Sequence, residues 1–137
     1  MSANLPDLPS RLLTDIETVA WQEILANQRV RESLSHVWAC SEFVATACLR
    51  APELLRELTA SGALFERAAD DAFAREVRER VSGASEAEVL EALRRFRKRH
   101  LVRIAWRDIA GWSDLDETLR DLSALADACI GFAYIYV

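Results

Sequence analysis

Two aspartates separated by one residue are the strongest candidate for metal chemistry in this chain. Asp114 and Asp116 lie in the tetrapeptide Ser-Asp-Leu-Asp that begins at Ser113. On a β-strand, side chains two residues apart point to one face, where two carboxylates can share Mg²⁺. The residues that follow, ETLRD, have helical spacing instead, and helix residues two apart do not face each other. We therefore interpret this tetrapeptide as the start of a helix, with Ser113 as the capping residue and the aspartates in the first turn.

A run of basic side chains is the candidate for binding phosphate or nucleic acid. Its members are Arg94, Arg95, Arg97, Lys98, Arg99, Arg103 and Arg107. Acidic residues are close in sequence, with Glu91 one helical turn before Arg94 and Arg95. Three aspartates on the next predicted helix are further candidate partners: Asp116, Asp121 and Asp127. We favour a solvated or internally paired basic face; docking to another domain and direct nucleotide contact remain alternatives.

Histidines and cysteines offer little support for a metal site. His36 and Cys40 are four residues apart on a predicted helix and could ligate one metal, but no third or fourth ligand is evident. His100 lies among arginines, whose charge favours neutral imidazole. Three cysteines without a C-x-x-C motif disfavour a disulfide framework or a zinc ribbon, so we expect Cys40, Cys48 and Cys129 to be small buried hydrophobes. We assign no catalytic, cofactor-binding or metal-binding residue.

The elements that must position these residues are predicted to be helices. Residues 1–9 contain two prolines and are expected to form a flexible lead-in, followed by helical structure over 10–137. Apolar spacing predicts helices over 12–24, over 30–38 with a possible extension to Arg50, over 52–61, over about 65–81, over 85–110 and from 113 onward. Pro52, Gly62, Gly83 and a Ser85/Glu88 capping box mark boundaries.

The same spacing predicts which side chains point inward. They are Leu54, Leu55, Leu58, Ala69, Phe73 and Val77, followed on the last helix by Leu115, Leu119, Leu122, Leu125, Ala126 and Cys129. The tryptophans Trp21, Trp38, Trp106 and Trp112 are expected to anchor a core or an interface. The final residues, IGFAYIYV, are rich in β-formers, but they continue the apolar stripe in phase, so we expect the helix to continue through them.

Composition agrees with an all-α fold. The 137 residues include 51% hydrophobic and 28% charged residues but only four glycines and three prolines. We expect an irregular multi-helix bundle of about six or seven helices. The net charge of −5 argues against a nucleic-acid binder, and no apolar stretch is long enough to cross a membrane. Because the start of the chain lacks an apolar signal core, we expect a cytoplasmic protein.

Two segments resemble the bacterial glutamine synthetase adenylyltransferase/adenylyl-removing family. They are EALRRFRKRHLVRIAWRD at 91–108 and DETLRDLSALAD at 116–127, with weaker similarity at 41–44 and 51–55. The resemblance implies a two-headed nucleotidyltransferase that uses ATP and Mg²⁺. One head adds AMP to a tyrosine of glutamine synthetase, the other removes it by phosphorolysis, and the PII signalling protein and glutamine set the balance.

In that family the catalytic carboxylates follow a glycine-rich turn, on a Ser-Asp-x-Asp strand. The resemblance aligns residues 113–116 with a preceding helix, so we expect this chain to be an inactive N-terminal helical segment that stops before the catalytic motif and supports or docks the catalytic domain. Its apolar end, from Ile130 to Val137, is expected to mediate self-association or to pack into the core. A self-contained helical interaction or regulatory module is the alternative.

Overall fold

The computed structural model describes residues 18–69, 71–81 and 85–136, with side chains up to Gly131. Within these ranges the chain forms seven α-helices and one 3-10 turn, and no strand. They are α1 (Val19–Leu25), α2 (Gln28–Cys40), α3 (Glu42–Arg50), α4 (Pro52–Ala60), η3 (Ala63–Phe65), α5 (Ala72–Val81), α6 (Glu86–Ile109) and α7 (Leu115–Tyr136). The predicted all-α, irregular multi-helix bundle is confirmed.

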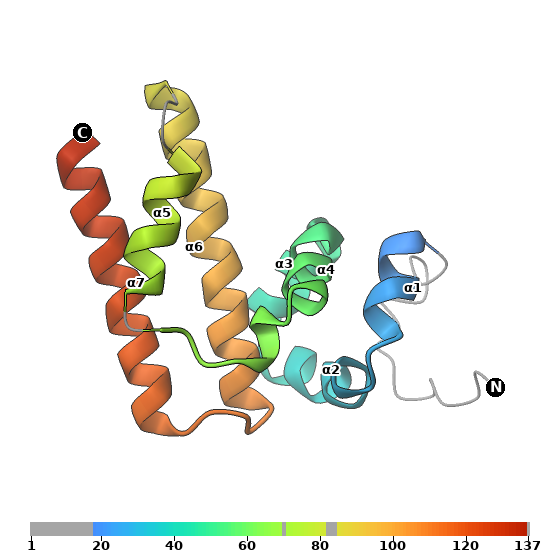
Figure 1. Cartoon of the computed structure of the whole chain (residues 1–137). Helices are drawn as coiled ribbons and strands as arrows, with labels where there is room; N and C mark the ends of the chain where they lie inside the picture. Colours follow the sequence, from blue (N-terminus) through green and yellow to red (C-terminus); the bar gives the residue numbers. More distant parts are fainter. Residues whose placement is uncertain (1–17, 70, 82–84, 137) are drawn as a thin grey trace.

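Helix α6 is shared by two groups of helices (Figure 1). Helices α5 and α7 pack along it on one side, whereas α2, α3 and α4 contact it on the other and α1 packs against α2 and α4. Its sequence explains the double role. Val102 and Trp106 are one turn apart and face the first group, while Ile104 lies about 200° around the helix from Val102 and faces the second. A helix with two apolar faces must be covered on both sides.

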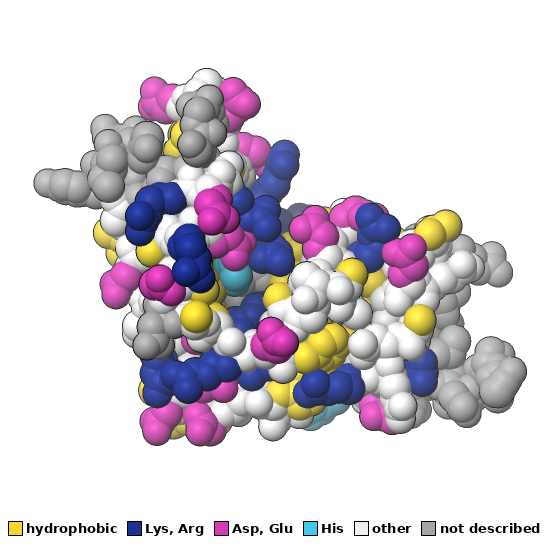
Figure 2. All heavy atoms as spheres, viewed as in Figure 1, with side chains coloured by type: hydrophobic (Ala, Val, Ile, Leu, Met, Phe, Trp, Pro, Cys, Tyr) yellow, Lys and Arg dark blue, Asp and Glu magenta, His cyan; other side chains and the backbone are white. Residues whose placement is uncertain are grey.

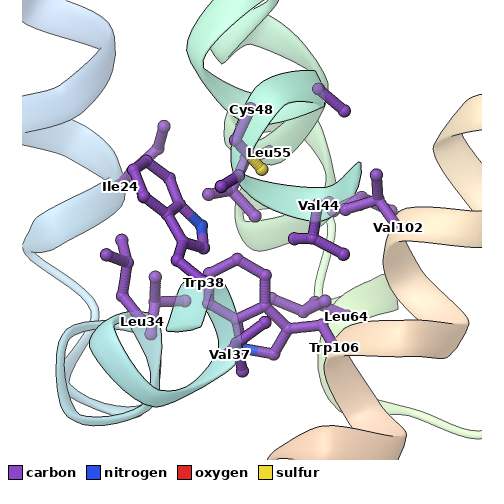
Figure 3. Packing of buried hydrophobic residues seen from close by; sticks show 14 of the residues in the cluster. Ile24, Leu34, Val37, Trp38, Val44, Cys48, Leu55, Leu64, Val102 and Trp106 are labelled. Carbon is purple, nitrogen blue, oxygen red and sulfur yellow. The ribbon is translucent and has the colours of Figure 1, made fainter. Parts of the chain in front are cut away.

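The first core is built on tryptophan (Figure 3). Trp21 of α1 and Trp38 of α2 meet edge to face, with ring centroids 5.7 Å apart, and both are buried. Trp106 of α6 packs against the same cluster, and its indole Nε1 donates to Ser33 Oγ at 2.9 Å. Aliphatic residues from α3 and α4 fill the remaining space. The expectation that tryptophans anchor the core is confirmed, with Trp112 packed half-buried at its edge.

The second core is smaller and lies between α5, α6 and α7. Phe73 and Phe96 meet edge to face at 6.5 Å, and the His100 ring lies 4.7 Å from each of them. Val77 and Leu125 complete the contact between α5 and α7. The predicted inward positions of Phe73 and Val77 are therefore confirmed.

Most helix boundaries lie where the sequence predicts them. Pro52 occupies the first turn of α4, and Gly62 follows that helix with a left-handed φ of 82° that an L side chain rarely adopts. The Ser85/Glu88 capping box opens α6 with both of its hydrogen bonds present. Helix α7 continues through the β-forming residues to Tyr136, as expected. The proposed lead-in over 1–9 and the stop at Gly83 lie outside the described residues.

Two predicted helix boundaries are wrong. The possible extension of the second helix to Arg50 fails at Ser41, whose backbone is extended and whose hydroxyl accepts the Val44 N–H to start α3 as a separate helix. Helix α5 begins at Ala72 rather than near Phe65, and Ala69 is exposed rather than inward. The carbonyls of η3 and the following residue accept hydrogen bonds from arginine side chains of α6, and this competes with a continuous helix.

Most of the predicted inward face of α7 is also wrong. Four of its expected core residues, Leu115, Leu119, Leu122 and Ala126, are exposed, and Cys129 is half-buried. Of the six expected residues, Leu125 is buried as predicted, and the helix also buries Thr118, Asp121 and Ala128. Polar residues are buried there because the opposing side chains on α6 are arginines. Hydrophobic spacing identified the helix correctly but not the face that contacts α6.

Candidate functional site

Two arginines of α6, Arg103 and Arg107, are buried at the junction of the two helix groups, with 2% and 4% of their surface exposed. Arg103 donates from Nε to the carbonyl of Ala63 at 2.9 Å, from Nη1 to Asp121 Oδ2 at 3.4 Å, and from Nη2 to the carbonyl of Glu66. Its planar fork thus joins α6 to α7, to η3 and to the residue after η3. Burial lowers the pKa of Arg103, and the charge of Asp121 opposes this effect.

Arg107 makes the corresponding contacts one turn later. Its guanidinium contacts Glu117 Oε2 at 2.8 Å from Nη2 and 3.1 Å from Nε, and donates from Nη1 to the Leu64 carbonyl at 3.2 Å. Nearby, Thr118 Oγ1 donates to Asp108 Oδ1 at 3.1 Å. A buried charge is costly unless it is paired and hydrogen-bonded, and both arginines meet that condition. They fix the position of α7 against α6.

A third polar cluster joins α5 to α6 around Glu76. Its carboxylate accepts from Arg99 Nη1 and pairs with His100 Nε2, each at 3.0 Å, and Arg80 Nε reaches it at 2.8 Å. Burial would raise the pKa of Glu76, but His100, Arg99 and Arg80 together lower it to about 2. Burial also lowers the pKa of His100, despite the opposing effect of Glu76. The imidazole is therefore neutral at pH 7 and donates its Nε2 proton to Glu76.

These contacts divide the basic run into two sets. Arg94 and Arg95 are exposed and pair with Glu91, as the sequence predicts. Among the three aspartates expected as partners, Asp121 pairs with buried Arg103. The partners Glu76 and Glu117 were not foreseen, since no local spacing connects residues on helices that meet only through packing. On the face shown in Figure 2, acidic and basic side chains are intermixed rather than gathered into a patch of one sign.

The candidate metal ligands do not form a site within the described residues. The Asp114 carboxylate accepts the Glu117 N–H at 2.8 Å and caps α7. The cap is therefore Asp114, whereas the expected cap, Ser113, places its hydroxyl 3.1 Å from Thr118 Oγ1. His36 and Cys40 lie close together, with 3.9 Å between Nδ1 and Sγ, yet no group of three metal-ligating side chains is found where the structure is described.

Of the three cysteines, only Cys48 is fully buried. Burial raises the pKa of its thiol to about 12, so the thiol stays protonated and unreactive. Cys129 is half-buried, and Cys40 is exposed rather than buried as expected. Cys40 is the last residue of α2, directly before the chain turns at Ser41, and its side chain lies outside the core.

An apolar groove of about 390 Å³ runs along α6 between α3 and α7. Its walls are formed by Phe43, Leu101, Ile104, Ala105 and Leu122, and Arg97 and Asp108 also line it. Leu122 is also one of three exposed leucines on α7, together with Leu115 and Leu119. This groove and the buried arginines are the two features of the described residues that suggest a role.

Comparison with known proteins connects these features to an enzyme. The family model described as glutamate-ammonia ligase adenylyltransferase matches residues 31–136. The chain belongs to this family. A bifunctional glutamine synthetase adenylyltransferase/adenylyl-removing enzyme of Nitrosococcus oceani is 40% identical over 144 residues, which is 96% of this chain and 15% of the relative. Enzymes with the same description from Thioalkalivibrio sulfidiphilus and Pseudomonas putida are 41% and 44% identical, over 96% and 76% of this chain.

The chain thus spans about 15% of the length of the adenylyltransferase relatives that it matches. No solved structure matches it. The glutamate-ammonia ligase adenylyltransferase match contains all of α6 and α7, and therefore both buried arginines and the groove. None of the helices in the described part of the chain combines the length and apolar content of a membrane span. Arg103 and Arg107 have a structural role in this chain, because their N–H groups donate to carbonyls and carboxylates of the same chain.

Proposed function

We propose that this chain is a helical segment of the enzyme that adenylylates and deadenylylates glutamine synthetase and thereby regulates nitrogen assimilation. The observation that carries the proposal is the family match over 31–136, together with relatives of that description that are several times longer than the chain. The segment is not catalytic itself. It supports or docks the nucleotidyltransferase domain that belongs to the deadenylylating half.

The cofactors of the reaction bind elsewhere in the whole enzyme. The Mg²⁺ that accompanies ATP requires convergent carboxylates, but Asp114 caps a helix and Asp116 is exposed on the first turn of that helix. These residues do not fit a metal centre. Glutamine synthetase as substrate, the PII protein as regulator and a cytoplasmic location are carried over from the family resemblance as parts of the same proposal.

The purified chain alone is expected to release no AMP from adenylylated glutamine synthetase and to transfer none from ATP. The measurement is the adenylylation state of glutamine synthetase by mass spectrometry, with and without Mg²⁺ and phosphate. Full-length Nitrosococcus oceani enzyme provides the positive control. Release of AMP by the chain would require Asp114 and Asp116 to be reconsidered as metal ligands.

A chimera tests the supporting role directly. This chain replaces the matched 144 residues of the Nitrosococcus oceani enzyme, with which it shares 40% identity. If the segment supports that enzyme, the chimera retains deadenylylation, whereas the enzyme with those residues deleted loses it. A chimera as inactive as the deletion would contradict the proposed function.

A further inference from the structure

The outward face of α7 carries apolar side chains that nothing in the described structure covers. Leu115, Leu119 and Leu122 are spaced four and three residues apart and therefore share one side of the helix. Their exposed fractions are 67%, 53% and 39%. Thr118, Asp121 and Leu125 lie about a quarter turn further around the helix and pack inward. The arginine contacts thus fix this leucine row toward the outside.

The leucine row is continuous with the groove on α6. Leu122 belongs to both, and across the groove stands Phe43 of α3, with 46% of its surface exposed. Arg97 and Asp108, which also line the groove, are eleven residues apart on α6 and thus about 16 Å apart along it. That length corresponds to about three turns of a helix laid alongside. The surface fits an amphipathic helix with an apolar stripe between charges complementary to Arg97 and Asp108.

We propose that this surface, defined by Phe43, Leu101, Leu115, Leu119 and Leu122, binds such a helix from the remaining polypeptide of the full-length enzyme. The inference rests on the proposed function. The relatives carry about 85% of their length outside the matched part, so an occupant is available within the same polypeptide. Covalent connection gives it a high effective concentration, so a modest apolar contact is sufficient.

The test compares two matched pairs of charged substitutions. Leu115→Glu with Leu122→Glu alters the proposed surface. Val19→Glu with Leu90→Glu is the control, because these side chains are 66% and 40% exposed and lie on α1 and near the start of α6. In the isolated chain, both double variants should keep the melting midpoint within about 3 °C, since exposed substitutions change stability little.

In the Nitrosococcus oceani chimera the two pairs should differ. Burying a leucine is worth more than a tenfold change in an equilibrium constant. The surface variant should therefore be cleaved by protease at least about tenfold faster than the unsubstituted chimera, and the control variant at the same rate as the chimera. Equal cleavage of all three proteins would overturn the inference while an active unsubstituted chimera would preserve the proposed function. An inactive unsubstituted chimera would overturn both.

Sedimentation distinguishes a second copy of the chain as the occupant. If the isolated chain forms dimers that the surface variant abolishes, and the chimera variants are cleaved equally, the leucine row serves self-association and the inference is wrong. A chimera variant that is cleaved faster, in an enzyme of unchanged oligomeric state, supports docking within one polypeptide.

Discussion

Arg103 uses its guanidinium on three partners from two other parts of the chain, and this places it among the residues most sensitive to change. Its neighbours Arg94 and Arg95 have the same chemistry but lie on the solvent side of α6. Sequence spacing alone cannot separate the two sets, because the basic run surrounds the helix. The buried arginines differ from the exposed ones because η3 and the residue after it pack against their side of α6 and offer backbone carbonyls as acceptors.

Replacement of Arg103 by methionine should destabilise the fold by about 3–5 kcal/mol, because Asp121 and two carbonyls lose their buried partner. Arg103→Lys should recover only part of the loss, since a single ammonium cannot replace a planar fork. Urea unfolding followed by circular dichroism measures both. Arg95→Ala is the control, because the pair of Arg95 with Glu91 is exposed and should contribute little. Equal effects at Arg103 and Arg95 would contradict the assigned role.

Acid should weaken the fold through Glu76 and His100. The pKa of Glu76 falls from 4.5 to about 2, so its contribution is complete above pH 4.5 and is lost as pH falls from 4.5 toward 2. The folded pKa of His100 is also lowered, so protonation of the unfolded chain reduces stability as pH falls below 6.5. Unfolding free energies in urea from pH 7 to pH 3 should therefore decrease steadily. Glu76→Gln should flatten the part below pH 4.5, and an unchanged slope would argue against the cluster.

At the scale of helices, local signals in the sequence predicted where helices begin and end better than which of their faces is buried. Pro52, Gly62 and the Ser85/Glu88 box act within one turn, so their effect is visible in the sequence. The break at Ser41 was missed because apolar spacing continues across it. The late start of α5 depends on arginines about 40 residues away, which no local pattern contains. The candidate metal pair was correctly assigned to a helix start, although the capping residue was one position off.

The cap of α7 gives a test at this scale. Asp114→Ala should cost roughly 1 kcal/mol, because the Glu117 N–H loses its acceptor. Asp114→Asn should be nearly neutral, since asparagine caps about as well as aspartate. The midpoint of urea unfolding measures the difference. If both substitutions lowered the midpoint equally, the charge of Asp114 rather than its hydrogen bond would be responsible, through the helix dipole.

At the scale of the whole molecule, α6 makes the two cores interdependent. Each core has its own aromatic centre, but Val102 and Trp106 serve one while Phe96 and Ile104 serve the other, on a single helix. The buried arginines add a second connection, because they tie η3 of the first group to α7 of the second. Both cores require α6, and loss of one core exposes an apolar face of that helix to water. We therefore expect one cooperative unfolding transition.

The tryptophans allow this to be measured, because all four lie in or against the first core. Their fluorescence reports that core alone, whereas far-UV circular dichroism reports every helix, and the two urea curves should coincide. Phe96→Ala in the second core should destabilise by about 3–5 kcal/mol. If the cores are coupled through α6, this distant substitution shifts the fluorescence midpoint as far as the dichroism midpoint. A shift in dichroism with fluorescence unchanged would mean that α1 to α4 fold without α5 and α7, and that α6 joins two independent units.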